Sequence, residues 1–156
     1  MNESQLMESA RNLAPPPPSA VEEFGRQREV IAARVNQIML GREDLDGIIG
    51  PGNRSVMEDN HRNHGRFMHS LFVGYEPQVF VETVLWVFRS YRSHGFRIGY
   101  WPTMLGAWVD VMREQVSPET FEAVHPFYEW LVTHHAAFFT LAQNAVPPTE
   151  RPRQGA

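Results

Sequence analysis

Apolar residues recur along most of this chain at the spacing of one face of an α-helix. These stripes predict five helices, over about residues 19–41, 56–74, 77–95, 99–116 and 117–145. No stretch alternates apolar and polar residues for long enough to form a β-sheet. We therefore expect an all-α fold. Periodicity alone does not choose between a globin-like bundle and an up-and-down bundle.

Three serines carry the signatures of helix starts. Ser19 and Ser55 each have a glutamate three residues later, which is the pattern of a capping box. Ser117 precedes Pro118, a residue favoured at the first helical position. We expect these three serines to be N-caps, and Gly41 to end the first long helix.

The remaining segments have the composition of connections and termini. Residues 1–18 end in four prolines, which predicts a flexible leader separated by a stiff stop from a domain over residues 19–145. Residues 41–54 are rich in Gly, Asp and Asn and are expected to form a loop. Residues 146–156 are rich in Pro and Arg and are expected to be disordered.

Composition narrows the function classes. A chain of 156 residues suits one domain, and a net charge of −4 without a basic run argues against nucleic-acid binding. The absence of cysteine excludes disulfides, thiolate metal sites and thioether-linked chromophores. No signal peptide and no run of ~18 apolar residues is present, so we expect a soluble cytoplasmic protein without membrane contact. No catalytic constellation is visible, which favours a binding protein over an enzyme.

The segment over residues 56–74 has an unusual stripe. His61 and His64 occupy positions where a core stripe would carry leucine. The chain has seven histidines but no metal-binding frame, so most are expected to be structural and no metal site is expected. Asp59 falls in the first turn, where a carboxylate stabilises the helix dipole by about 0.3–1 kcal/mol without any ligand.

Three short motifs in this region resemble those of phycobiliproteins, whose pattern is Cys-x-x-Asp, Leu-x-Gly-Asp and Tyr-x-x-Leu-Gly on two successive helices. The corresponding residues here are Val56-Met-Glu-Asp59, Phe72-Val-Gly-Tyr75 and Tyr91-Arg-Ser-His-Gly95. The match covers about a quarter of the chain. Asp59 falls on the aspartate that bonds the pyrrole nitrogens of the bilin, and Val56 falls on the cysteine that forms the thioether.

Without that cysteine, the pattern resembles that of the bilin-binding globins associated with bilin biosynthesis. The resemblance implies a globin-like fold that holds a linear tetrapyrrole, such as biliverdin or a reduced bilin, non-covalently as carrier, store or sensor. Arginines suit the two propionates of such a ligand, and flat aromatic side chains could stack on its rings. The bilin-binding residues that we expect are Asp59, Val56, Arg62, Asn63, Arg66, Tyr91, Tyr100 and Trp101.

Two other functions stay open. A haem-binding or sensor globin would use His94 or His64 as the iron ligand, because globins place that ligand near a helix end. A helical interaction or signalling domain would bind no ligand, and its aromatic residues would simply form the core. The resemblance also leaves open a homodimer, and partners that synthesise or receive the bilin.

Overall fold

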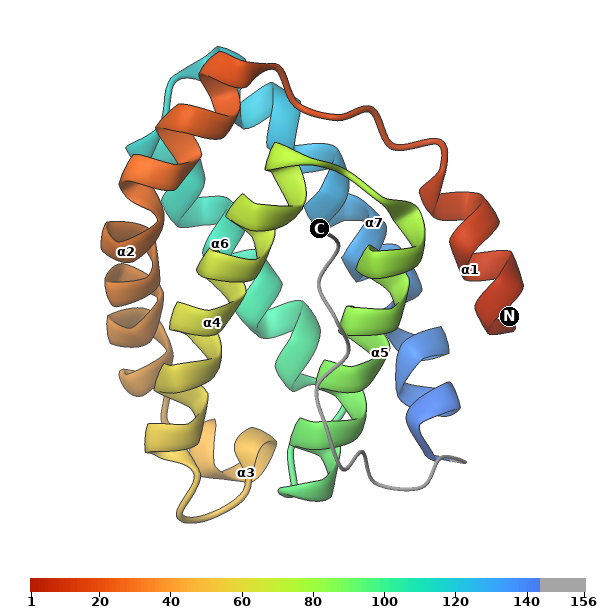
Figure 1. The fold of residues 1–156 in the computed structure, drawn as a ribbon. Helices are drawn as coiled ribbons and strands as arrows, with labels where there is room; N and C mark the ends of the chain where they lie inside the picture. Colours follow the sequence, from red (N-terminus) through yellow and green to blue (C-terminus); the bar gives the residue numbers. More distant parts are fainter. Residues whose placement is uncertain (144–156) are drawn as a thin grey trace.

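The computed structural model describes residues 1–143, which form helices joined by short connections and contain no strand (Figure 1). The expectation of an all-α fold is therefore confirmed. The helices of this part of the chain are α1 (Glu3–Ala10), α2 (Pro18–Leu40), α3 (Leu45–Ile49), α4 (Arg54–Val73), α5 (Pro77–Ser93), α6 (Tyr100–Gln115) and α7 (Pro118–Gln143).

The long helices enclose one aromatic core. Helix α2 packs against α4 and α6, and α7 packs against α5 and α6, so that α6 lies behind the gap between α4 and α5 in Figure 1. Phe72 of α4 is at the centre of the core. Its ring lies 5.1 Å from that of Phe24 in α2 and 5.0 Å from that of Phe127 in α7, both edge to face. Aromatic pairs of this kind add about 0.5–1.5 kcal/mol each to the burial of their area.

Only one of the three expected serine caps is confirmed. The Ser117 hydroxyl accepts a hydrogen bond from the Thr120 amide at 3.3 Å, at the start of α7. Ser19 is not a cap, because Pro18 takes the first helical position of α2 and the N-cap is Pro17, two residues earlier than expected. The expectation that Ser55 is an N-cap is also wrong, because α4 begins at Arg54 and Asn53 occupies the N-cap position. Gly41 ends α2 as expected.

The expectation of a flexible leader is wrong for residues 3–10, which form α1. Leu6 and Ala10 are fully buried where α1 packs against α5 and α7. Trp130 donates its indole N–H to the Ser9 hydroxyl at 3.0 Å. A helix of eight residues is unstable alone, so its formation depends on these tertiary contacts. The expected loop likewise contains α3, and the expected disordered tail lies outside the described residues.

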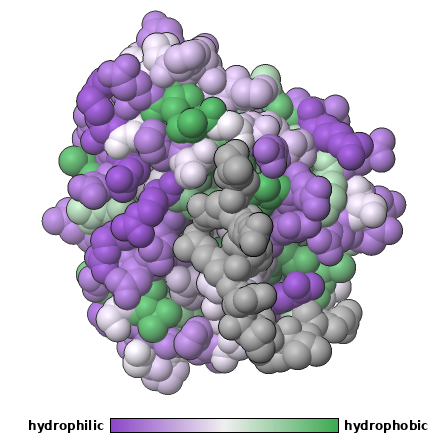
Figure 2. Space-filling model, in the orientation of Figure 1, coloured by the Kyte–Doolittle hydropathy of each residue, from purple (hydrophilic) through white to green (hydrophobic). Residues whose placement is uncertain are grey.

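One face of the described part is mainly polar. Figure 2 shows hydrophilic side chains over most of one face, with hydrophobic side chains in separate small patches. Such isolated apolar residues are normal on a folded protein. None of the described helices combines the length and the hydropathy needed to cross a lipid bilayer.

Candidate ligand-binding site

A cavity of about 100 Å³ lies among α4, α5 and α6, with one residue from α7. Its wall is mostly apolar and aromatic, and consists of Asn60, Asn63, His64, Phe67, Met68, Val84, Trp86, Val87, Phe88, Tyr91, Trp101, Met104, Leu105 and Leu131. An apolar cavity of about 150 Å³ is large enough for benzene. The present cavity is smaller than this, so it could admit at most one small ring.

Trp101 contributes the face of its indole ring to this wall. Its ring stacks on Phe88 with centroids 4.1 Å apart and planes 12° apart, and the residue is 2% exposed. Its indole N–H is buried and has no acceptor among the described residues. Leaving such a donor unsatisfied costs about 1–3 kcal/mol, so the role of Trp101 in this wall rests on its apolar ring surface.

His64 lies in the same wall as a neutral imidazole. Its Nε2 shares a hydrogen bond of 2.9 Å with the Tyr128 hydroxyl, and its ring packs edge to face on Trp108. Burial lowers the pKa of His64 to about 3 and raises the pKa of Tyr128. Both groups are therefore uncharged at neutral pH.

Behind the cavity, four buried side chains form one hydrogen-bonded row that joins α6, α4 and α2. Asn60 donates its amide to the Tyr100 hydroxyl at 2.7 Å, and that hydroxyl donates to Nε2 of His61 at 2.9 Å. Nδ1 of His61 then donates to Oδ1 of Asn36. Burial, with smaller effects from nearby His64 and Arg62, lowers the pKa of His61 to about 3 and so keeps it neutral.

Three of the residues expected to bind bilin come together at this cavity. Asn63 of α4, Tyr91 of α5 and Trp101 of α6 all line its wall, although they are far apart in the sequence. Tyr100 is buried behind the wall in the hydrogen-bonded row. The structure therefore groups half of the expected residues at or beside one cavity.

The other four expected residues do not line the cavity. Asp59 is 63% exposed and forms an ion pair with Arg62, while Val56 packs half-buried at the edge of the core. Arg62 and Arg66 border a separate hollow between α4 and α2.

The two candidate haem ligands lie in different parts of the structure. His64 lines the cavity, but His94 is exposed at the end of α5 and does not line it. The backbone carbonyl of His94 accepts a hydrogen bond of 2.7 Å from the side chain of Asn53. That contact fixes the connection before α4 and leaves the imidazole at the surface.

Several wall residues were not singled out as site residues by the sequence. Phe88 belongs to the expected apolar stripe of its helix, and Phe67, Met104 and Leu105 have the character of core residues. A stripe that lines a cavity has the same pattern as a stripe that fills the core, so no sequence signal separates the two.

Comparison of the chain with known protein families, with curated proteins and with solved structures finds no match.

Proposed function

We propose that this protein has a globin-like fold and binds a linear tetrapyrrole non-covalently, as a carrier, store or sensor of a bilin such as biliverdin. The observation that carries the proposal is the cavity that brings Asn63, Tyr91 and Trp101 together. These three residues are among the bilin contacts that we expected from the sequence. The chain has no cysteine, so the bound pigment would be released on denaturation.

The size and polarity of the cavity suit one end of a bilin. A bilin is an open chain of four rings, and each terminal ring is a lactam with its own carbonyl oxygen. One such ring is the largest part of a bilin that a cavity of about 100 Å³ could admit, and the flat Trp101 and Phe88 rings of its wall could cover that ring. The other rings would lie outside the cavity.

Asp59 is close enough to the cavity wall to contact those outer rings. It precedes Asn63 by four residues on α4, a distance of about 6 Å along the helix axis. Residues four apart lie on the same side of a helix. A ligand that leaves the cavity past Asn63 would therefore meet the carboxylate of Asp59, which can accept hydrogen bonds from pyrrole N–H groups.

Haem suits this site less well than bilin. A porphyrin is a closed, rigid ring system that cannot insert one ring by itself into a cavity for about one ring. Nε2 of His64 is also occupied by the Tyr128 hydroxyl, and His94 is away from the cavity. Haem binding and the absence of any ligand are the two alternatives that the experiment must distinguish.

Titration of the purified protein with biliverdin should produce an enhanced red absorption band, and Trp101→Phe should weaken this binding by about three- to tenfold. The smaller phenyl ring offers the ligand less apolar surface, and a three- to tenfold loss corresponds to about 0.6–1.4 kcal/mol. Trp108→Phe is the matched control, because its indole N–H is also buried without a partner but Trp108 does not line the cavity. We expect this control to bind biliverdin as the wild type does.

Two spectra would contradict the proposal. A sharp Soret band on addition of haem, without any red band on addition of biliverdin, would support the haem-binding alternative. No change with either pigment would support a ligand-free interaction domain.

Asp59→Asn should shift the bilin band to shorter wavelength and weaken binding by about three- to tenfold. The amide keeps the shape and one acceptor but loses the charge that strengthens the hydrogen bonds, and solvent exposure limits the effect. Asp110→Asn makes the same change at an exposed position on α6 and should leave the titration unchanged. An unaltered spectrum and affinity for Asp59→Asn would exclude Asp59 from the site.

A further inference from the structure

A second hollow, of about 300 Å³, lies between α2 and α4 and is separate from the cavity. Two alanines of α2 contribute short side chains to it, so the longer polar residues border an open space. Three of these are arginines: Arg28 of α2, and Arg62 and Arg66 of α4. Glu29 is the only carboxylate among the residues that border this hollow.

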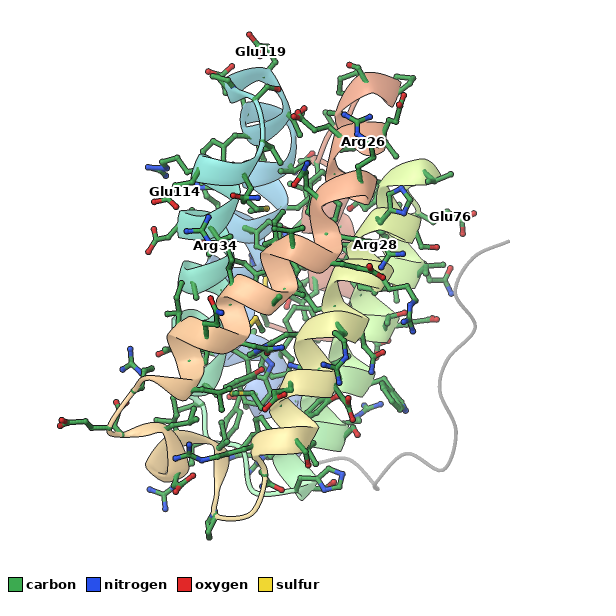
Figure 3. All side chains as sticks on the ribbon, turned by 90° about the vertical axis from the view of Figure 1, so that its left-hand side faces the viewer. Arg26, Arg28, Arg34, Glu76, Glu114 and Glu119 are labelled. Atoms are coloured by element: carbon green, nitrogen blue, oxygen red, sulfur yellow. The ribbon has the colours of Figure 1, made fainter. Side chains whose placement is uncertain are left out.

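The arginines retain most of their capacity to donate hydrogen bonds. Figure 3 shows Arg28 on the edge of α2 next to α4, whereas Arg34 lies on the other edge, where it pairs with Glu114 at 2.6 Å. The nearest carboxylate oxygen to Arg28 is that of Glu29, at 3.7 Å, and Glu29 is 82% exposed. Arg66 contacts Asn63 at 3.5 Å and has no ion pair among the described residues. Arg62 is paired with Asp59.

A buried amide adds a neutral donor to the same hollow. Asn36 is 9% exposed and borders the hollow. The Tyr100 hydroxyl donates to Nε2 of His61, so Nδ1 of His61 carries the proton and Oδ1 of Asn36 accepts it. This arrangement turns the Nδ2 amide of Asn36 away from His61, and the described residues offer that nitrogen no acceptor.

We propose that this hollow is a binding site for a small oxyanion ligand that carries phosphate or carboxylate groups. Three guanidinium groups and one buried amide are all donors, and planar guanidinium groups match the oxygens of such anions in pairs. The exposed side chain of Glu29 can turn into solvent. The hollow is bordered by neither Asn63 nor Trp101, so the proposal does not rest on bilin binding, although the ion pair of Arg62 with Asp59 links the two sites.

The proposal can be tested by isothermal titration of the full chain, without pigment, with pyrophosphate in one series and citrate in another. We expect at least one of these anions to bind, and the stronger one identifies phosphate or carboxylate as the preferred group. Arg66→Gln and Arg28→Gln should each weaken binding by about tenfold, as expected for loss of a charge-assisted pair. Asp59→Asn should strengthen binding severalfold, because it releases Arg62.

Arg26→Gln provides the matched control. It removes the same charge from α2, but Arg26 pairs with Glu22 and does not border the hollow. We expect this variant to bind within about twofold of the wild type, because exposed charges away from a site are screened. The proposal is overturned if neither anion binds, or if Arg26→Gln weakens binding as much as Arg66→Gln does. Neither result would decide whether the protein binds bilin, because the biliverdin titration tests that proposal separately.

Discussion

Acidification from pH 7 to pH 5 should lower the free energy of unfolding by about 2–4 kcal/mol, well before the carboxylates titrate. The cause is burial of His61 and His64, which lowers the pKa of each from 6.5 to about 3. The unfolded chain binds protons at these histidines near pH 6.5, whereas the folded chain does not. Their stabilisation is therefore complete above pH 6.5 and is lost as the pH falls toward 3, by about 1.4 kcal/mol per pH unit for each histidine.

Chemical denaturation at a series of pH values would measure this effect. His61→Gln removes one of the two groups, so its stability should fall with decreasing pH less steeply than that of the wild type, by about 1.4 kcal/mol per pH unit. His94→Gln is the control, because His94 is exposed, and it should keep the slope of the wild type. Equal slopes for the wild type and His61→Gln would show that His61 is not kept neutral by the fold.

Tyr100→Phe should lower the free energy of unfolding by about 2–4 kcal/mol. The hydroxyl accepts from Asn60 and donates to His61, so its removal leaves one buried donor and one buried acceptor without partners. Each unsatisfied buried group costs about 1–3 kcal/mol, and water has little access because Tyr100 and His61 are fully buried.

Tyr75→Phe offers a comparison with the same chemical change. The Tyr75 hydroxyl donates to the carbonyl of Ala10 in a partly buried position, so water can replace the lost bond. We expect a loss of only about 0.5–1.5 kcal/mol for this variant. Urea unfolding of the two variants would measure the difference. A loss below about 1 kcal/mol for Tyr100→Phe would contradict the importance of the buried row.

The helices were predictable because their signals are local. The stripes of apolar residues and the pair Ser117–Pro118 depend on spacing within one or two turns, and α7 begins as they indicate. The N-cap of α2 was missed by two residues because two local signals compete, and Pro18 extends the helix before Ser19. Helix α1 was missed for a different reason. Its eight residues are stabilised by burial of Leu6 and Ala10 against α5 and α7, which no local pattern shows.

For the site, the sequence by itself indicated which residue types and which region to consider, through Asp59, His64 and the motif around Tyr91. Only the tertiary structure decided which of them meet. It brings Asn63, Tyr91 and Trp101 to one cavity and directs Arg62 and Arg66 to the other hollow. The physical reason is that helix periodicity sets the side on which a residue lies, whereas tertiary packing determines what each side faces: one side of α4 meets α2, and another faces the cavity that α5 and α6 also line.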